Sequence, residues 1–190
     1  LFINNNYKYI FVPNILAFTH YNGYIERIIN FIGKLNPQVQ NDLLVRIIGF
    51  DNWSLKKKIL KYYPNIKFCD ENTKLGKIYK NSKLAISTHI GTTMVETLTS
   101  NIPACILIDD YEFDIIKNKQ KKYYKLLQNI NILHTDLSEC SEHINDLLLK
   151  GNLSNWWNTP ETKNNVSEFR ENICFHNPNL SKDIIDIIKE

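Results

Sequence analysis

The feature of this sequence that most constrains its fold is the alternation of short strand-like runs with segments of helical periodicity. The strand-like runs are Tyr9–Val12, Leu43–Ile48, Ile66–Cys69, Lys83–Thr88, Ala104–Ile108 and Asn131–His134. Between the first two, Ile25, Ile28, Ile29 and Ile32 recur at helical spacing. Ala104–Ile108 is apolar on both faces, as a central parallel strand must be when helices cover both sides of a sheet. The sequence therefore predicts an α/β fold with a Rossmann-like, doubly wound, mostly parallel sheet.

Composition narrows the class of protein further. A chain of 190 residues with 43% hydrophobic residues is long enough for one domain with its own core. Its 23 basic residues nearly cancel its 20 acidic ones, and a net charge of +3 gives no reason to expect a nucleic-acid partner. The apolar runs are far shorter than the ~20 residues of a membrane span. No signal peptide pattern opens the chain, so we expect a cytoplasmic protein, at most peripheral to a membrane.

The pattern changes near residue 150, which divides the predicted organisation in two. We expect residues 1–150 to form a Rossmann-like lobe and residues 151–190 to form a helical tail packed on it. The tail carries Trp156-Trp157, then helical patterns over Val166–Phe175 and Ile184–Ile188. The chain begins at Leu1 rather than at Met and enters a strand almost at once. We therefore expect a fragment from which a preceding lobe is missing.

Candidate ligand-binding residues are expected in the loops that follow the strands, because open α/β sheets bind ligands beyond the carboxyl ends of their strands. These loops are Pro13–Gly23, Gly49–Trp53, Asp70–Lys74, Thr88–Thr93 and Asp109–Glu112. The fourth is the most informative. Gly91 lets the backbone approach a ligand closely, and a helix starting at Thr92 presents free N–H groups and its positive dipole end. With the hydroxyls of Thr92 and Thr93, this loop is suited to a phosphate.

Glu96 follows one helical turn later, where a carboxylate could accept hydrogen bonds from two ribose hydroxyls. The same residues allow a purely structural interpretation. Thr93-x-x-Glu96 has the spacing of a capping box, in which the Glu side chain returns to the backbone of its own cap. The local sequence leaves both interpretations open.

The segment Asn81–Pro103 resembles the donor-binding signature of GT-B glycosyltransferases, with a strand, a small-residue loop, T-x-x-E on a helix and an N-x-P entry to the next strand. More closely, nearly the whole chain resembles a family of bacterial transferases encoded in surface-polysaccharide loci, although only their C-terminal half. The likeness extends to Asp51-Asn52-Trp53 and Trp156-Trp157. Family members tend to carry an aromatic–Asn pair where this chain has Asp109-Asp110, and a second Arg where it has Lys57-Lys58.

The resemblance implies roles for individual residues. It places the donor phosphate on Gly91, Thr92 and Thr93, the ribose on Glu96, and the base near Asp70. Ser87, Thr88 and His89 belong to the same donor-binding segment, with His89 able to stack on the nucleotide or bond to it.

The first loop would face the other lobe near the leaving phosphate. There Asn22 and Gly23 would contact the donor, and His20 would be the catalytic residue that donates a proton or hydrogen bond as negative charge develops. A surface loop histidine is the structural alternative for His20.

These expectations describe the donor-binding half of a glycosyltransferase that uses a CMP-, UDP- or CDP-linked sugar in cell-surface polysaccharide or lipopolysaccharide synthesis. The acceptor would be a glycan or a lipid-linked glycan, and the half would be inactive without its N-terminal lobe. We expect no cofactor, no essential metal and no nucleic-acid partner. A non-catalytic binding module and a sugar-nucleotide epimerase remain as alternatives.

Other residues have structural interpretations that weigh more than functional ones. Cys140-x-x-His143 with Cys174-x-His176 could form a zinc site, but such unequal spacings are unusual for one. Trp156-Trp157 could form a sugar platform, although packing of the tail explains it as well. Asp109–Glu112 could bind a cation or sugar hydroxyls, and solvation of a loop is the simpler interpretation.

Overall fold

A computed structural model describes residues 9–13, 21–47, 54–70, 73 and 75–174. Its centre is a six-stranded sheet in the order β3-β2-β1-β4-β5-β6, and every strand pair in it is parallel. The strands are β1 (Tyr9–Val12), β2 (Leu43–Val45), β3 (Lys67–Phe68), β4 (Leu84–Ser87), β5 (Ala104–Leu107) and β6 (Leu133–His134). This confirms the predicted doubly wound sheet, and all six predicted strands are present.

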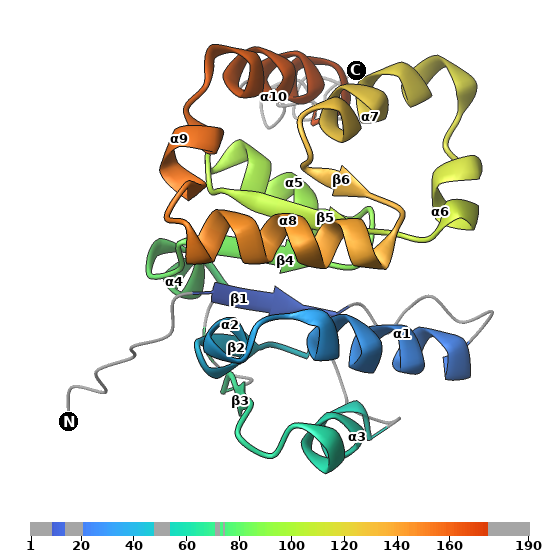
Figure 1. Cartoon of the computed structure of the whole chain (residues 1–190). Helices are drawn as coiled ribbons and strands as arrows, with labels where there is room; N and C mark the ends of the chain where they lie inside the picture. Colours follow the sequence, from blue (N-terminus) through green and yellow to red (C-terminus); the bar gives the residue numbers. More distant parts are fainter. Residues whose placement is uncertain (1–8, 14–20, 48–53, 71–72, 74, 175–190) are drawn as a thin grey trace, which may run out of the picture.

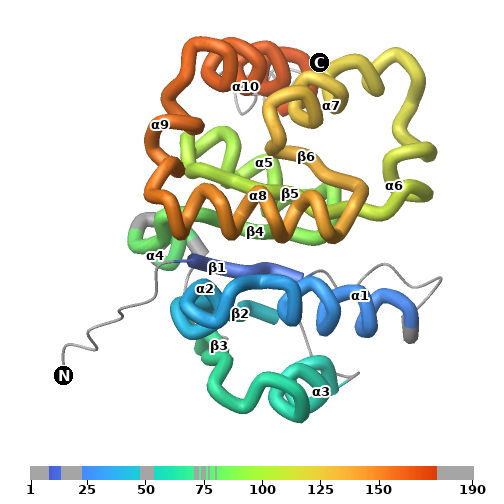
Figure 2. Tube along the Cα trace, in the orientation of Figure 1, coloured from blue at the N-terminus to red at the C-terminus, as the bar shows by residue number. Residues whose placement is uncertain are grey.

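Helices connect the strands and cover both faces of the sheet (Figure 1). They are α1 (Tyr21–Lys34), α2 (Pro37–Asn41), α3 (Leu55–Tyr62), α4 (Leu75–Lys80), α5 (Thr92–Thr99), α6 (Asp110–Asp114), α7 (Asn118–Asn129), α8 (Leu137–Leu149), α9 (Leu153–Trp157) and α10 (Pro160–Ile173). Figure 2 shows α1 and α8 running side by side across one face, with α5 behind the sheet.

The alternation of side chains along each strand assigns them to the two faces. In β1, Phe11 packs into the core shared with α1, α3 and α8, while Ile10 and Val12 pack with α4 on the other face. In β5, Cys105 lies on the α1/α8 face and Ile106 on the opposite one. All four residues of both strands are buried, as expected for central parallel strands.

The segment after residue 150 packs against the domain through α10, which contacts α5 and α7. Phe169 of α10 is fully buried, and its ring meets that of Tyr124 of α7 edge-on at 5.1 Å. Trp157 is buried, and the indole N–H of Trp156 donates to the carbonyl of Ile130 at 2.9 Å. The tryptophan pair therefore packs the tail and does not form an open sugar platform. The predicted Ile184–Ile188 helix lies outside the described residues.

The first connection differs from the prediction. α1 begins at Tyr21, so Gly23 stands in the first turn of a helix and not in the loop expected there. The same helix continues past Gly33 to Lys34. A Cβ at Gly33 would lie 2.5 Å from the hydroxyl oxygen of Tyr63, so this glycine makes room for the end of α3. α2 was not predicted; Asn36 caps it and Pro37 occupies its first turn.

Among the described residues, no helix is both long enough and apolar enough to cross a membrane.

Candidate functional site

The strand order reverses between β1 and β4, which lie side by side at the centre of the sheet. Connections from these two strands leave toward opposite halves of the sheet, and ligands of open α/β folds bind in the crevice that results. On the β4 side the crevice is formed by residues 88–91. On the β1 side the described chain reaches Pro13, and the proposed catalytic residue His20 lies outside the described residues. The sequence prediction of a site at the end of β4 therefore falls at the topological switch point.

The N-terminus of α5 opens onto this crevice. Gly91 is the N-cap and makes no side-chain cap hydrogen bond to the N–H groups of the first turn. Thr93 is therefore already inside the helix, and Glu96 cannot form a capping box with it. The structure excludes the capping interpretation and leaves the Glu96 carboxylate exposed. The N–H groups of the first turn have no side-chain cap, which is the arrangement that receives an anion in helix-terminal sites.

The first residues of the loop are held by the core and present little surface. Ser87 and Thr88 are 6% and 8% exposed. The hydroxyl of Thr88 forms a hydrogen bond of 2.6 Å with that of Tyr24 on α1. Both residues were predicted to bind the donor. Their burial and the Thr88–Tyr24 hydrogen bond are what the structure shows, and donor binding by them stays a prediction.

Glu112 ties the loop to α6. Its Oε1 lies 2.5 Å from Nδ1 of His89 and accepts the backbone N–H of Ile90 at 2.6 Å. The His89 side chain is 37% exposed, whereas that of Glu112 is 15% exposed. A Cβ on Gly91 would lie 3.0 Å from Cδ2 of His89, so the imidazole packs directly over the glycine. Glu112 thereby orients His89 across the mouth of the α5 N-terminus.

Replacing Glu112 with alanine is expected to lower the free energy of unfolding by about 1–3 kcal/mol, because the partly buried N–H of Ile90 loses its acceptor. Glu112→Gln should cost less, since the amide oxygen can still accept from Ile90. Urea unfolding measures both, with the exposed Glu142→Ala on α8 as control. A loss no greater than that of the control would contradict the tether.

Two buried polar groups lie near Glu96. The hydroxyl of Tyr79 lies within hydrogen-bonding reach of the Thr93 side chain and near the charges of Glu96 and Arg46. Nε of Arg46 is buried and has no hydrogen-bond partner in the described part of the chain. Burial and the nearby charge of Glu96 raise the pKa of Tyr79, so this hydroxyl is protonated and available as a donor. The Arg46 guanidinium also donates from its other end to the carbonyl of Thr73. The unpaired Nε of Arg46 is a buried donor for which a polar ligand would supply the partner.

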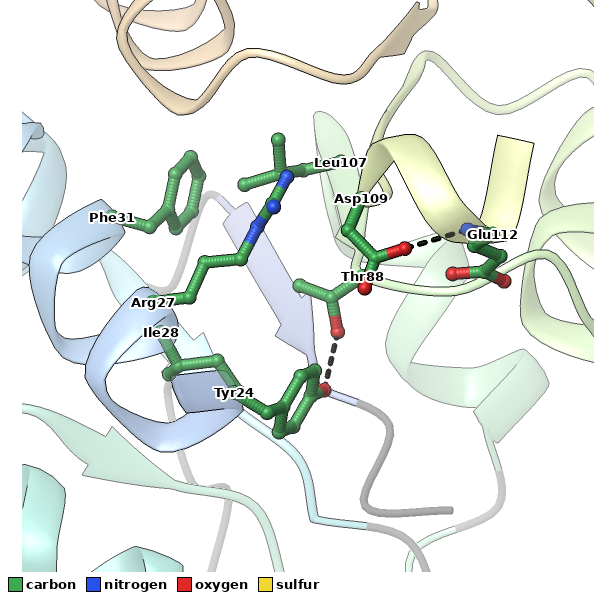
Figure 3. A pocket seen from close by; sticks show the side chains of 8 residues that line it. All are labelled: Tyr24, Arg27, Ile28, Phe31, Thr88, Leu107, Asp109 and Glu112. Carbon is green, nitrogen blue, oxygen red and sulfur yellow. Dashed lines mark hydrogen bonds between the residues drawn. The ribbon is translucent and has the colours of Figure 1, made fainter. Parts of the chain in front are cut away.

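A small pocket adjoins the loop between α1 and the ends of β4 and β5 (Figure 3). Arg27 reaches across it and donates to the carbonyls of Ile108 and, at 2.9 Å, Thr135. Asp109 accepts the N–H of Glu112 at 2.6 Å and caps α6. Arg27 and Asp109 therefore act as structural ties beside the crevice, and the interpretation of Asp109 as a cation ligand loses its main support.

The remaining predicted site residues are spread along the same edge of the sheet. Asp70 follows β3 and is exposed, with β2 and β1 between its strand and β4. The backbone of Asn22 and all of Gly23 lie in the first turn of α1. Sequence reasoning missed Tyr79 and underrated Glu112. Glu112 could have been found from its place after β5, but no local pattern distinguishes Tyr79.

Comparison with solved structures defines the class of fold. The chain matches the wall teichoic acid polymerase TagF, in a structure with CDPG, at 16% identity with a TM-score of 0.52 over 97% of this chain and 42% of that one. It matches α,α-trehalose 6-phosphate synthase from Burkholderia multivorans at 12% identity with a TM-score of 0.52, over 88% of this chain and 40% of that one. The fold is that of a GT-B glycosyltransferase domain, and the chain spans less than half the length of either protein.

The family follows from the sequence itself. A model of the LIC12162 family of transferases matches residues 4–188, and the chain belongs to that family. Among curated proteins, none matches the sequence significantly.

Proposed function

We propose that this chain is the donor-binding half of a bacterial glycosyltransferase that takes a sugar from a nucleotide-activated donor in cell-surface polysaccharide synthesis. Membership of a transferase family and the GT-B fold support the reaction class. The observation that carries the donor site is the uncapped N-terminus of α5 at the topological switch point, with Glu96 exposed one turn further on.

In this proposal the phosphate lies on the N–H groups and hydroxyls of Thr92 and Thr93, with Gly91 giving close access. The α5 dipole stabilises the negative charge that grows on the leaving nucleotide. Glu96 accepts hydrogen bonds from the ribose hydroxyls. The Tyr79 hydroxyl, which lies by Thr93 and near Glu96, and the unpaired Nε of Arg46 would complete the polar shell.

The transfer itself would be a direct displacement in which the acceptor attacks the anomeric carbon and the nucleotide departs. This half holds the leaving group with dipole and hydrogen bonds, and we expect no metal at the phosphate. His20 is our candidate for a proton or hydrogen bond to the leaving phosphate. The acceptor-binding groups, including any base, would belong to the preceding lobe, and the reaction would take place in the cytoplasm or at the membrane surface.

The choice of nucleotide is tested by isothermal titration of the chain with CMP, UMP, CDP and UDP. We expect at least one to bind. Thr93→Ala should weaken that binding by about tenfold, the equivalent of one hydrogen bond of about 1.5 kcal/mol to a charged group. Thr99→Ala is the matched control, because its hydroxyl donates to the carbonyls of Val95 and Glu96 in its own helix, at the far end of α5.

The role of Glu96 has a separate signature. The wild type should prefer a ribonucleotide to its 2′-deoxy analogue, and Glu96→Gln should reduce that preference along with the affinity. Failure of all four nucleotides to bind a folded chain would sink the donor site. Nucleotide binding that neither Thr93→Ala nor Glu96→Gln changes would place the donor site elsewhere on the chain. Binding of a glycan without binding of any nucleotide would favour the non-catalytic module.

A further inference from the structure

A second cluster of reactive side chains lies away from the donor loop, beneath α8. Cys105 of β5, His134 of β6 and His143 of α8 each offer one ligand atom, and these three atoms lie within 4.8 Å of one another. The residues come from three different elements and are separated by up to 38 positions in the sequence. Cys105 and His134 are buried and His143 is half-buried.

The imidazole rings of His134 and His143 each have a feature that suits them to bind a metal ion. Nε2 of His134 lies 2.8 Å from the carbonyl oxygen of Asn131. A carbonyl can only accept, so Nε2 carries the proton and Nδ1 keeps a lone pair. A backbone carbonyl that fixes the tautomer of a histidine in this way is the usual outer-shell partner of a metal ligand.

His143 has the opposite feature. Its Nε2 is buried and has no hydrogen-bond partner within the described residues. Its ring is held by aromatic contacts, at 5.5 Å from the His134 ring and 5.1 Å from that of Trp156. Burial also lowers the pKa of His143 to about 4, so the ring is neutral at physiological pH. An unpaired buried nitrogen costs stability, and a metal ion would satisfy it.

We propose that Cys105, His134 and His143 form a binding site for a borderline-soft divalent cation of the Zn²⁺ class. Imidazole nitrogen and thiolate sulfur are the ligands that zinc prefers. Tetrahedral zinc with a sulfur at about 2.3 Å and nitrogens at about 2.0–2.1 Å brings its ligand atoms to roughly 3.4–3.6 Å from one another. The spacings of the three atoms, at most 4.8 Å, therefore have to shorten around the ion.

Binding releases the thiol proton of Cys105 to solvent, and the thiolate bonds to the cation. Burial raises the pKa of this thiol, so the metal has to displace a proton that would otherwise stay. A water molecule would supply the fourth ligand, so Cys105 is the single thiolate of the proposed site. The ion would clamp α8 to β5 and β6. This role is structural, and none of the three ligands belongs to the donor loop.

The test uses the whole chain, reduced and stripped with a chelator, and Co²⁺ as the probe. We expect one equivalent of Co²⁺ to produce thiolate-to-metal charge-transfer absorption, and Zn²⁺ to abolish it by displacement. Cys105→Ala should remove the absorption. His143→Gln should weaken cobalt binding by more than the about 10- to 100-fold that loss of an outer-shell partner costs.

Cys69→Ser and Cys174→Ser are the matched controls, because neither thiol belongs to the cluster, and both should bind as the wild type does. Circular dichroism without metal checks that each variant is folded. As a second readout, Zn²⁺ should raise the thermal midpoint of the wild type and not that of His143→Gln. Absence of charge-transfer absorption in the folded wild type, its persistence in Cys105→Ala, or its loss in either control would overturn the site.

Discussion

Gly91→Ala is expected to weaken nucleotide binding by about 10- to 100-fold. That is the equivalent of one charge-assisted hydrogen bond of about 1.5–3 kcal/mol. The backbone of Gly91 is extended, with φ at −162° and ψ at −164°, so alanine meets no conformational strain there. The added methyl group would instead lie 3.0 Å from Cδ2 of His89, whose ring is tied to Glu112. It would push the ring aside and cover the point where the phosphate has to approach the α5 N-terminus.

Gly76→Ala is the matched control for this prediction. A Cβ at Gly76 meets nothing within 4 Å, and the residue is exposed on α4. Alanine should therefore raise the free energy of unfolding by about 0.4–1 kcal/mol and leave nucleotide affinity unchanged. Both affinities are measured by titration with the nucleotide that the wild type binds best. Wild-type affinity in Gly91→Ala would show that the phosphate does not approach the backbone at this residue.

The largest effect on stability is expected from Phe169→Ala, which should lower the free energy of unfolding by about 3–5 kcal/mol. Phe169 is fully buried, with 0% of its surface exposed to solvent. It belongs to the hydrophobic cluster that joins α10 to Met94 and Leu98 of α5. It also makes the edge-on ring contact with Tyr124. Removing the ring leaves a cavity between the tail and the helix that carries the donor loop.

Urea unfolding followed by circular dichroism measures this loss, with the exposed neighbour Glu168→Ala as control. A single transition that moves to lower urea would show that α10 unfolds with the sheet. An unchanged main transition preceded by an early loss of helix would show instead that the tail is a separate unit. The predicted division near residue 150 would then describe independent folding units.

Most of the fold could be predicted because its signals are local. Apolar runs of the kind seen at Ala104–Ile108 can be buried only between two helical layers, and the alternation with helices requires parallel connections. The local turn signal at Gly23 was misleading. The first loop was expected to extend to this residue, but α1 begins at Tyr21 and includes it.

The site was only partly predictable. The Gly91–Glu96 string is contiguous, so its chemistry could be seen without the fold. The supporting contacts join residues distant in sequence: Tyr24 with Thr88, and Arg27 with Thr135. The capping-box interpretation of Thr93 and Glu96 also needed the structure, because helix spacing does not say which residue begins the helix.

What the sequence determined by itself is the class of fold and the loop on which the proposed function depends, because periodicity and a short motif are properties of neighbouring residues. Only the tertiary structure decided which side chains support that loop and which polar groups remain unpaired. It brought Glu112 to His89, and it gathered Cys105, His134 and His143 beneath α8. The physical reason is that strand order and helix packing set the distances between these side chains. Neither can be predicted from the spacing of residues along the chain.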